Sequence, residues 1–221
     1  NADDPRVAAM ATRCAGRVVL FGEHADAHVR VTDVRLDELA RPSFALSTPW
    51  GRVDVRLGIS GAHMVGNAAA ALALVGVVGG DLAAAADALG TVRLTSMRMD
   101  VATAASGAIV IDDSYNANPT SMRAAIDALA ALPAERRFAV LGVMAEITDP
   151  VLEHRAIHGY AAERGVEVLA TGTDLYGVTP VPDPVAALGP LGRGDAVLVK
   201  GSRVAGLERV AEALRLVSPR H

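Results

Sequence analysis

A cluster of oxygen- and amide-bearing side chains follows a short apolar run in the middle of the sequence. The cluster consists of Asp112, Asp113, Asn116 and Asn118. Before it, residues 108–111 form a short apolar run with β-branched residues, which is typical of a buried strand. After it, Pro119 suits the first position of a helix, and apolar residues recur at helical spacing through Leu129. The segment therefore predicts a strand, a polar loop and a helix, and ligands of open α/β sheets bind at such carboxyl ends of strands.

A second cluster of polar residues follows another apolar run, 196–199. It contains Lys200, Ser202 and Arg203, and Lys200 is the only lysine among 21 basic residues. Because the carboxyl ends of parallel strands meet at one edge of a sheet, we expect Lys200 to share a crevice with Asp113. The string Lys-Gly-Ser is common in loops, so on its own it is weak evidence for a site.

The order of the expected elements indicates an α/β protein with two domains. Residues 27–57 predict three antiparallel strands, and helices are expected at 62–79 and 82–89. From about residue 98, strands and helices alternate, which predicts a doubly wound, mostly parallel (Rossmann-like) sheet. Its expected strands are 109–111, 138–141, 166–170 and 196–199, and its expected helices are 120–132, 152–164, 185–188 and 207–214. We therefore divide the chain into domains 1–98 and 99–221.

The composition narrows the class of protein. Hydrophobic residues make up 51% and aromatic residues 3%, so small aliphatic side chains must build the core. A net charge of −4 gives no electrostatic case for binding nucleic acid. No apolar run reaches the roughly 20 residues of a membrane span, and the first residues lack a signal-peptide pattern. Cys14 is the only cysteine, which fits the reducing cytoplasm; on its Ala-rich helix we expect it to be buried.

The stretch Asp112-Asp-Ser-Tyr-Asn-Ala-Asn-Pro119 resembles the Mur ligase family, and within it the branch (MurF type) that joins D-alanyl-D-alanine to UDP-N-acetylmuramoyl tripeptide. The resemblance continues in the family's order over most of the chain. Its further motifs are Asn1-Ala-Asp-Asp-Pro5, Gly61-Ala-His-Met-Val-Gly-Asn67, Arg98-Met-Asp100 and Lys200-Gly-Ser-Arg203. The resemblance implies an ATP- and Mg²⁺-dependent peptide ligase of cytoplasmic peptidoglycan precursor synthesis. In this family ATP lies between a central P-loop domain and a carboxyl-terminal domain, which residues 1–98 (in part) and 99–221 would represent.

The resemblance also assigns roles to individual residues. The implied ATP-binding residues are Asn1, His63, Asn67, Arg98, Asp113 and Asn116. The implied substrate-binding residues are Asn118, Lys200, Ser202 and Arg203, with Lys200 or Arg203 pairing with the dipeptide's carboxylate. It gives no catalytic residue and no metal ligand. Taken bare, Arg98 would be a surface arginine, Asp112 a structural partner and Asn118 the cap of the following helix.

Several positions depart from the family's pattern. Met64 and Val143 stand where the pattern has Asn and Asp, and a thioether cannot replace an amide in hydrogen bonding. A P-loop needs Gly before its Lys, and Val199 precedes the only lysine. We therefore expect a ligase fragment without the P-loop and UDP-sugar portions, which would be its partners in the site. We expect it not to turn over alone.

The alternative is a non-catalytic nucleotide- or peptide-binding module derived from a Mur ligase. Glu146, His154 and Arg155 are expected in a loop and on a helix surface, and a substrate role for them stays open.

Overall fold

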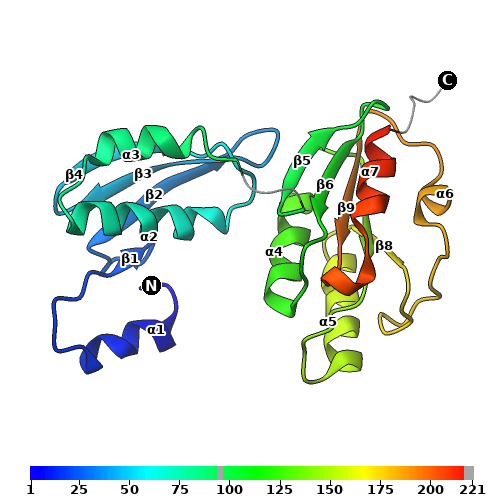
Figure 1. Ribbon diagram of the computed structural model, residues 1–221, viewed down its shortest axis with the longest axis horizontal. Coiled ribbons are helices and arrows are strands. Elements are labelled where there is room, and N and C mark those ends of the chain that lie inside the picture. Colours follow the sequence, from blue (N-terminus) through cyan, green and yellow to red (C-terminus); the bar gives the residue numbers. More distant parts are fainter. Residues whose placement is uncertain (94–96, 217–221) are drawn as a thin grey trace. The chain divides into compact units, whose positions relative to one another are not determined.

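The structure is a computed structural model that describes residues 1–93 and 97–216. The chain forms two compact units, Asn1–Arg93 and Leu94–His221 (Figure 1). The change of sequence pattern predicts a boundary at 98/99, a few residues further along. The assignment of the two units to particular ligase domains stays a prediction.

A four-stranded sheet with order β1-β2-β3-β4 forms the first unit. Its elements are α1 (Pro5–Ala9), η1 (Met10–Arg13), β1 (Phe21–Gly22), β2 (Val29–Leu36), β3 (Pro42–Thr48), β4 (Gly51–Arg56), α2 (Met64–Val77) and α3 (Leu82–Leu89). The three antiparallel strands predicted at 27–57 are present as β2, β3 and β4. The apolar sequence at 17–21 also predicts a strand, but only the two-residue β1 forms there, parallel to β2.

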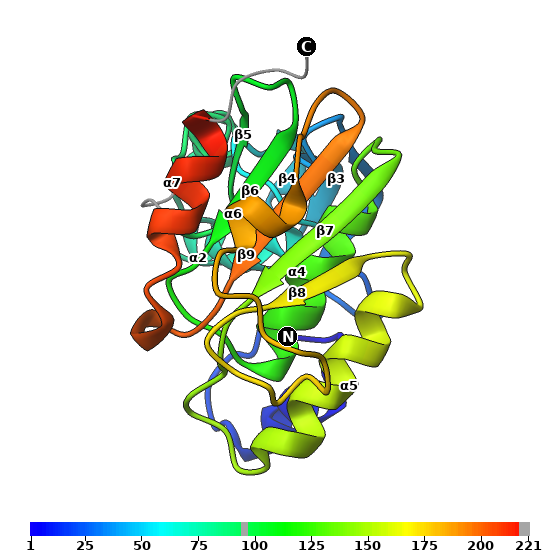
Figure 2. The same ribbon diagram turned by 90° about the vertical axis from the view of Figure 1, so that its right-hand side faces the viewer.

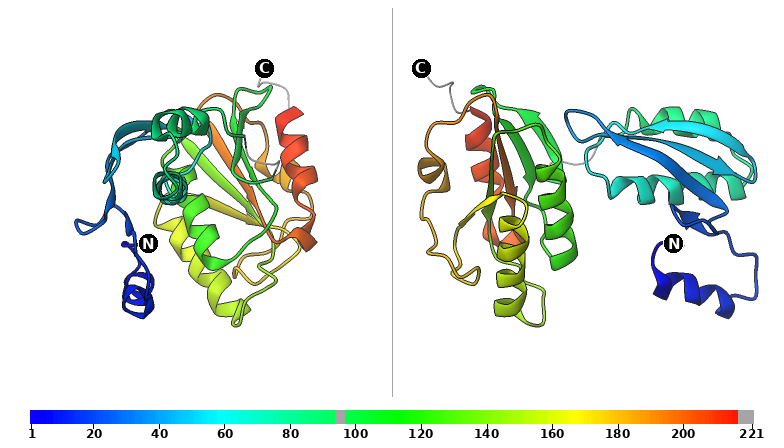
Figure 3. Two further views of the ribbon diagram at one scale, coloured as in Figure 1. Left: turned by 60° about the vertical axis from the view of Figure 1, so that its left-hand side comes forward. Right: turned by 180° about the vertical axis from the view of Figure 1, so that it is seen from behind.

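One face of this sheet carries the core of the first unit. Alternate residues such as Val29 and Val31 point to that face because side chains alternate along a strand. Helices α2 and α3 lie on one side of the sheet and cover it (Figure 3). The alanines of α2 allow close approach, and at Gly76 a Cβ atom would lie 2.2 Å from the Trp50 ring. Asp81 begins α3 by accepting hydrogen bonds from the N–H groups of Ala83 and Ala84.

The structure near the amino terminus differs from what the sequence predicts. The stretch from Pro5 to about residue 15 predicts a single helix, but helix α1 ends at Ala9 and the chain continues as the 3₁₀ helix η1. None of the residues of α1 or η1 is buried. Cys14 follows η1 and is exposed, so the prediction of a buried cysteine was wrong. An Ala-rich sequence predicts a helix but does not say that another layer covers it.

The second unit contains a five-stranded sheet with order β5-β6-β9-β7-β8. Its elements are β5 (Asp100–Thr103), β6 (Ile109–Asp113), α4 (Pro119–Ala130), β7 (Arg136–Leu141), α5 (Pro150–Ala162), β8 (Glu167–Ala170), α6 (Pro184–Leu188), β9 (Asp195–Lys200), η2 (Arg203–Ala205) and α7 (Glu208–Leu216). The strands from β6 to β8 in this order are parallel. The predicted α/β fold with a mostly parallel sheet is confirmed. The sequence pattern missed β5, an antiparallel edge strand.

Helices cover both faces of this sheet. Helices α4 and α5 lie on one side and α6 and α7 on the other (Figure 1), and Figure 2 views the sheet from the side of α6 and α7. The central strand β9 is buried along its whole length, and neighbouring residues serve opposite layers. Val197 and Val199 belong to the core beside Leu214 of α7, while Leu198 between them is buried on the other face. Because β9 lies between β6 and β7, their carboxyl ends meet at one edge.

No helix among the described residues is long and apolar enough to cross a membrane.

Candidate functional site

The loops after β6, β7 and β9 surround a pocket of about 740 Å³ in the second unit. Side chains of opposite charge, one aromatic ring, an amide and a hydroxyl line it. The lining residues are Met97, Arg98, Tyr115, Asn116, Ala145, Glu146, Ser202, Arg203 and Val204. The pocket therefore lies at the carboxyl ends of parallel strands, where the fold predicts a ligand site.

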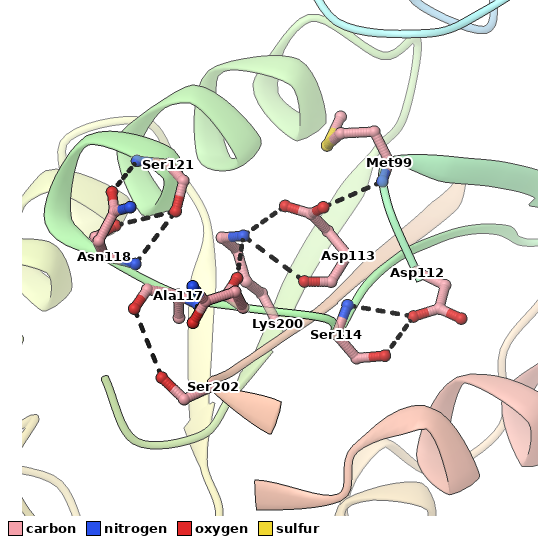
Figure 4. Close-up of polar contacts among 10 residues, drawn as sticks. Met99, Asp112, Asp113, Ser114, Ala117, Asn118, Ser121, Lys200 and Ser202 are labelled. Carbon is pink, nitrogen blue, oxygen red and sulfur yellow. Dashed lines mark hydrogen bonds and ion pairs between the residues drawn. The ribbon is translucent and has the colours of Figure 1, made fainter. Parts of the chain in front are cut away.

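Lys200 lies at the carboxyl end of β9, two residues before Ser202 of the pocket lining. In the parallel register it lies opposite Asp113, and its ammonium group forms an ion pair with the Asp113 carboxylate (Figure 4). Nζ also donates to the backbone carbonyl of Asn116 at 2.8 Å. The other carboxylate oxygen of Asp113 accepts from the N–H of Met99 at 3.0 Å. Lys200 is only 1% exposed. Its ammonium group is already paired with Asp113, so a ligand carboxylate could bind it only by displacing Asp113.

The remaining polar residues of the β6–α4 loop mainly hold the backbone. Asp112 is buried and accepts from the Ser114 hydroxyl at 2.6 Å, which agrees with the structural role expected for it. Asn118 accepts from the Ser121 N–H at 2.8 Å, and the Ser121 hydroxyl accepts from the Asn118 N–H in return (Figure 4). This reciprocal capping box starts α4. The Asn116 side-chain oxygen accepts from the Ala117 N–H at 2.8 Å.

Two arginines near one aromatic ring supply the positive charge of the pocket. The guanidinium carbon of Arg98 lies 4.0 Å from the centre of the Tyr115 ring, and that of Arg203 lies 6.0 Å from it. Tyr115 is 42% exposed, and its N–H donates to the Met97 carbonyl at 3.1 Å. Arg203 also points toward the Met97 sulfur, at 3.1 Å. These contacts hold two positive charges near one exposed aromatic ring.

Another part of the pocket lining belongs to the loop after β7, which the loop after β9 and helix α5 hold in place. Ser202 donates its N–H to the Val143 carbonyl at 2.8 Å, and its hydroxyl accepts from the Ala145 N–H at 2.9 Å. From α5, the Nε2 atom of His154 accepts from the Met144 N–H at 2.9 Å. Ser202 thus has a backbone-fixing contact that the sequence alone did not predict.

His154 is completely buried, so its expected position on a helix surface was wrong. Since Nε2 accepts a hydrogen bond, Nδ1 carries the proton and donates to the Pro150 carbonyl at 2.6 Å. Burial lowers the pKa of His154, although the bond to Pro150 opposes this shift. Helical spacing offered a signal, because position 154 shares a face with the buried Ile157 and Ala161.

No group of three or more potential metal-binding side chains (His, Cys, Asp or Glu) occurs among the described residues. The described residues thus contain no preformed cluster of side chains for a metal ion. Two guanidinium groups, an amide and an exposed aromatic ring instead suit a ligand that combines anionic groups with a planar group.

Comparisons with known proteins agree with this architecture. Residues 1–75 match the Mur ligase middle domain, and residues 97–182 match the domain described as "Mur ligase, glutamate ligase domain". The chain belongs to the Mur ligase family. Its UDP-N-acetylmuramoyl-tripeptide--D-alanyl-D-alanine ligase relative from Mycobacterium tuberculosis (strain ATCC 25618 / H37Rv) is 39% identical, over 97% of this chain and 50% of that protein.

Two further comparisons extend this result. The ligase of the same name from Escherichia coli (strain K12) is 36% identical over 78% of this chain and 41% of that protein. The solved structure of the D-alanyl-D-alanyl ligase from Acinetobacter baumannii has a TM-score of 0.78 and 26% identity, covering 94% of this chain and 48% of that one. The chain spans about half the length of the curated relatives it matches.

Within this Mur ligase chain, the predicted site residues fall into three groups. Those that line the pocket are Arg98, Asn116, Ser202 and Arg203. Those that hold the adjoining backbone are Asp113, Asn118 and Lys200. Those that belong to the first unit are Asn1, His63 and Asn67. Their roles toward a ligand stay predictions.

The first-unit candidates have local contacts of their own. The Asn1 side-chain oxygen accepts from the Asp3 N–H at 2.9 Å. Asn67 directs its amide toward the sulfur of Met64, at 3.5 Å. The Met64 substitution thus leaves the Asn67 amide with a weak sulfur acceptor.

Proposed function

We propose that this chain supplies the second half of an ATP-dependent ligase site that joins D-alanyl-D-alanine to UDP-N-acetylmuramoyl tripeptide. The observation that carries the proposal is the pocket of about 740 Å³ that Arg98, Arg203 and Glu146 line together. It occurs in a chain that is 39% identical to a ligase of this name. We further propose that the protein acts in the cytoplasm, in peptidoglycan precursor synthesis.

In the proposed reaction, the substrate carboxylate attacks the γ-phosphorus of ATP, and ADP leaves. The amine of D-alanyl-D-alanine then attacks the acyl carbon, an amide bond forms, and inorganic phosphate leaves with the acyl C–O bond broken. Arg98 and Arg203 would bind anionic oxygens, which guanidinium groups contact in pairs. The planar face of Tyr115 would lie beside the nucleotide or sugar. Residues 1–93 contribute Asn1, His63 and Asn67 as further ATP-binding candidates.

Lys200 and Asp113 take positioning roles in this proposal. Their ion pair and the bond from Lys200 to the Asn116 carbonyl hold the β6–α4 loop. The dipeptide carboxylate would then pair with Arg203, which lines the pocket, while the buried ammonium of Lys200 stays paired with Asp113.

Magnesium, which the family resemblance implies, would be held mainly by phosphate oxygens of the nucleotide, with one or two carboxylates of the complete ligase. We propose that the P-loop and the UDP-sugar-binding part act as partners, and that the 221-residue chain alone does not turn over.

Ligand titrations of the ¹⁵N-labelled chain test the proposal. We expect ATP to shift the amide signals of Arg98, Tyr115 and Asn116, and Arg98→Gln and Arg203→Gln to weaken this binding about tenfold each. Arg209→Gln, at an exposed arginine on α7, is the matched control and should leave the affinity unchanged. The proposal fails if ATP and D-alanyl-D-alanine both leave the pocket signals unmoved, or if all three variants behave alike.

The alternative is a non-catalytic nucleotide- or peptide-binding module. Two losses of polar side chains, Met64 and Val143, favour it. Joining the chain to the missing half of a relative separates the two ideas. An active ligase supports the enzyme, whereas ligand binding without product formation supports the module.

A further inference from the structure

A buried histidine, His154, contacts the loop after β7 two residues before Glu146, which lines the pocket. Four successive residues, 142–145, lead from the end of β7 to Glu146, and each has a fixed backbone group. Tyr176 donates its hydroxyl to the Gly142 carbonyl at 2.8 Å, and Ser202 binds Val143 and Ala145. The remaining group, the Met144 N–H, donates to His154.

His154 is the one contact in this set that comes from α5. Its ring is fully buried, and the bond from its Nδ1–H to the Pro150 carbonyl fixes the ring orientation. Tyr176 packs edge-on against it, with ring centres 4.8 Å apart. A ring fixed in this way offers its acceptor nitrogen at one position only, so it also fixes the Met144 N–H.

We propose that His154 is a positioning residue that sets the Ala145–Glu146 wall of the pocket and makes ligand binding depend on its neutral form. The inference rests on the proposed function in one respect, namely that this pocket binds the nucleotide. Glu146 lines the pocket together with Arg98 and Arg203, so a shift of this part of the wall changes the charge that the ligand meets.

The chemistry of the ring explains the dependence on protonation. A second proton would have to go on Nε2, which would turn the acceptor of the Met144 N–H into a donor. Two N–H groups would then face each other in a buried site, and the loop would have to move. Burial lowers the pKa of His154 in agreement with this arrangement.

Among the described residues, the groups that form hydrogen bonds with the His154 ring or pack edge-on against it carry no charge. From the β8–α6 loop, Tyr176 faces the ring, and burial raises the pKa of its hydroxyl, so it stays neutral. On α5 itself, the exposed Arg155 lies against Gly177 of the neighbouring loop. From the loop after β7, the group that faces the ring is the Met144 amide.

Nuclear magnetic resonance of the full 221-residue chain tests the positioning directly. The His154 ring should show a proton on Nδ1 and none on Nε2 at pH 7.5. His154→Gln offers an amide oxygen as a non-titrating acceptor, and it should keep the Ala145 and Glu146 amide signals near their wild-type positions. His154→Leu has no acceptor and should displace them. A proton on Nε2, or equal signals in the Leu and Gln variants, would overturn the inference.

ADP binding then provides the functional readout. We expect His154→Leu to weaken ADP binding by about fivefold or more, the effect of one lost neutral hydrogen bond, and His154→Gln to bind within about twofold of the wild type. The wild-type affinity relative to His154→Gln should fall as the pH drops from about 7.5 to 5. His158→Gln, one turn further along α5, is the matched control and should keep the wild-type pH profile.

The outcomes separate the two proposals. If ADP fails to bind the wild-type chain, the proposed function of the pocket fails. The amide signals of Ala145 and Glu146 then still test the positioning role of His154. If ADP binds and the Leu and Gln variants have equal affinities at every pH, the positioning role fails alone.

Discussion

Lys200 and Asp113 lie opposite each other in the parallel register of β9 and β6, and their side chains form an ion pair at the edge of the sheet. The sequence predicts that the two residues share one crevice, and the structure places them in contact. Their charges are directed at each other, while the accessible cations of the pocket are Arg98 and Arg203. The cations at this edge therefore have different roles. Lys200 pairs with Asp113, whereas Arg98 and Arg203 are accessible to a ligand.

Breaking this pair should destabilise the second unit strongly. Lys200→Met leaves the carboxylate of Asp113 largely buried with only the Met99 N–H, and loss of one partner of a buried pair costs about 3–5 kcal/mol. Urea unfolding followed through amide signals of β9 measures the change. Arg164→Met is the control, because its pair with Asp127 is half exposed and should contribute at most about 1 kcal/mol. Equal losses of unfolding free energy in the two variants would show that the buried Lys200–Asp113 pair stabilises the fold no more than an exposed pair does.

Two glycines of α2 should respond in opposite directions to alanine. A Cβ at Gly76 would lie 2.2 Å from the Trp50 ring, whereas at Gly66 nothing lies within 4 Å. We expect Gly76→Ala to destabilise the first unit by about 1–3 kcal/mol through overpacking. Gly66→Ala should stabilise it by up to about 1 kcal/mol, since alanine favours helix. Fluorescence of Trp50, the only tryptophan, reports both, and a stable Gly76→Ala variant would contradict the packing.

The regular elements were largely predictable because their sequence periodicities are strong. The runs that form β6 and β9 are continuous and apolar, as burial on both faces requires. Strand β5 was missed because Asp100–Thr103 has no such run and depends on pairing with β6. Such a strand is specified by its partner rather than by its own composition.

The location of the site was also predictable, but the use of each polar group was not. Because Lys200, Asp113 and Asn118 follow the predicted strands, the sequence correctly predicted that they lie at the carboxyl edge of the sheet. It could not show that Lys200 faces Asp113 or that Asn118 binds Ser121, because these contacts depend on rotamers and loop paths. His154 was misplaced because an isolated histidine on a helix is usually exposed, and its partner Met144 belongs to another element.

Asn118 should act first as a helix cap. Asn118→Ala removes the capping box of α4 and should lower the free energy of unfolding of the second unit by about 1 kcal/mol. Asn118→Asp keeps an acceptor for the Ser121 N–H and should stay close to the wild type. If the Asp and Ala variants are equally unstable, the side chain contributes through something other than the cap.

Acid should destabilise the second unit through His154. Because its pKa is lowered by burial, the unfolded chain binds a proton near pH 6.5 before the folded chain does. Stability is then unaffected well above pH 6.5 and falls as the pH drops from there toward the folded-state pKa. His154→Gln should remove this component of the slope in urea unfolding at pH 5–8, while His158→Gln should not. A slope that survives in His154→Gln would have to come from other groups.

Tyr115 should hold the Arg98 guanidinium in the position that binds the ligand. The ring offers its face at 4.0 Å from the guanidinium carbon, and an exposed contact of this kind contributes about 0.5–1 kcal/mol. Tyr115→Phe keeps the ring and should bind ATP like the wild type. Tyr115→Leu should weaken binding by about twofold to fivefold, because Arg98 then loses its fixed orientation. In the Arg98→Gln background the same Leu substitution should have less effect, and equal effects in both backgrounds would show that the ring acts on the ligand without Arg98.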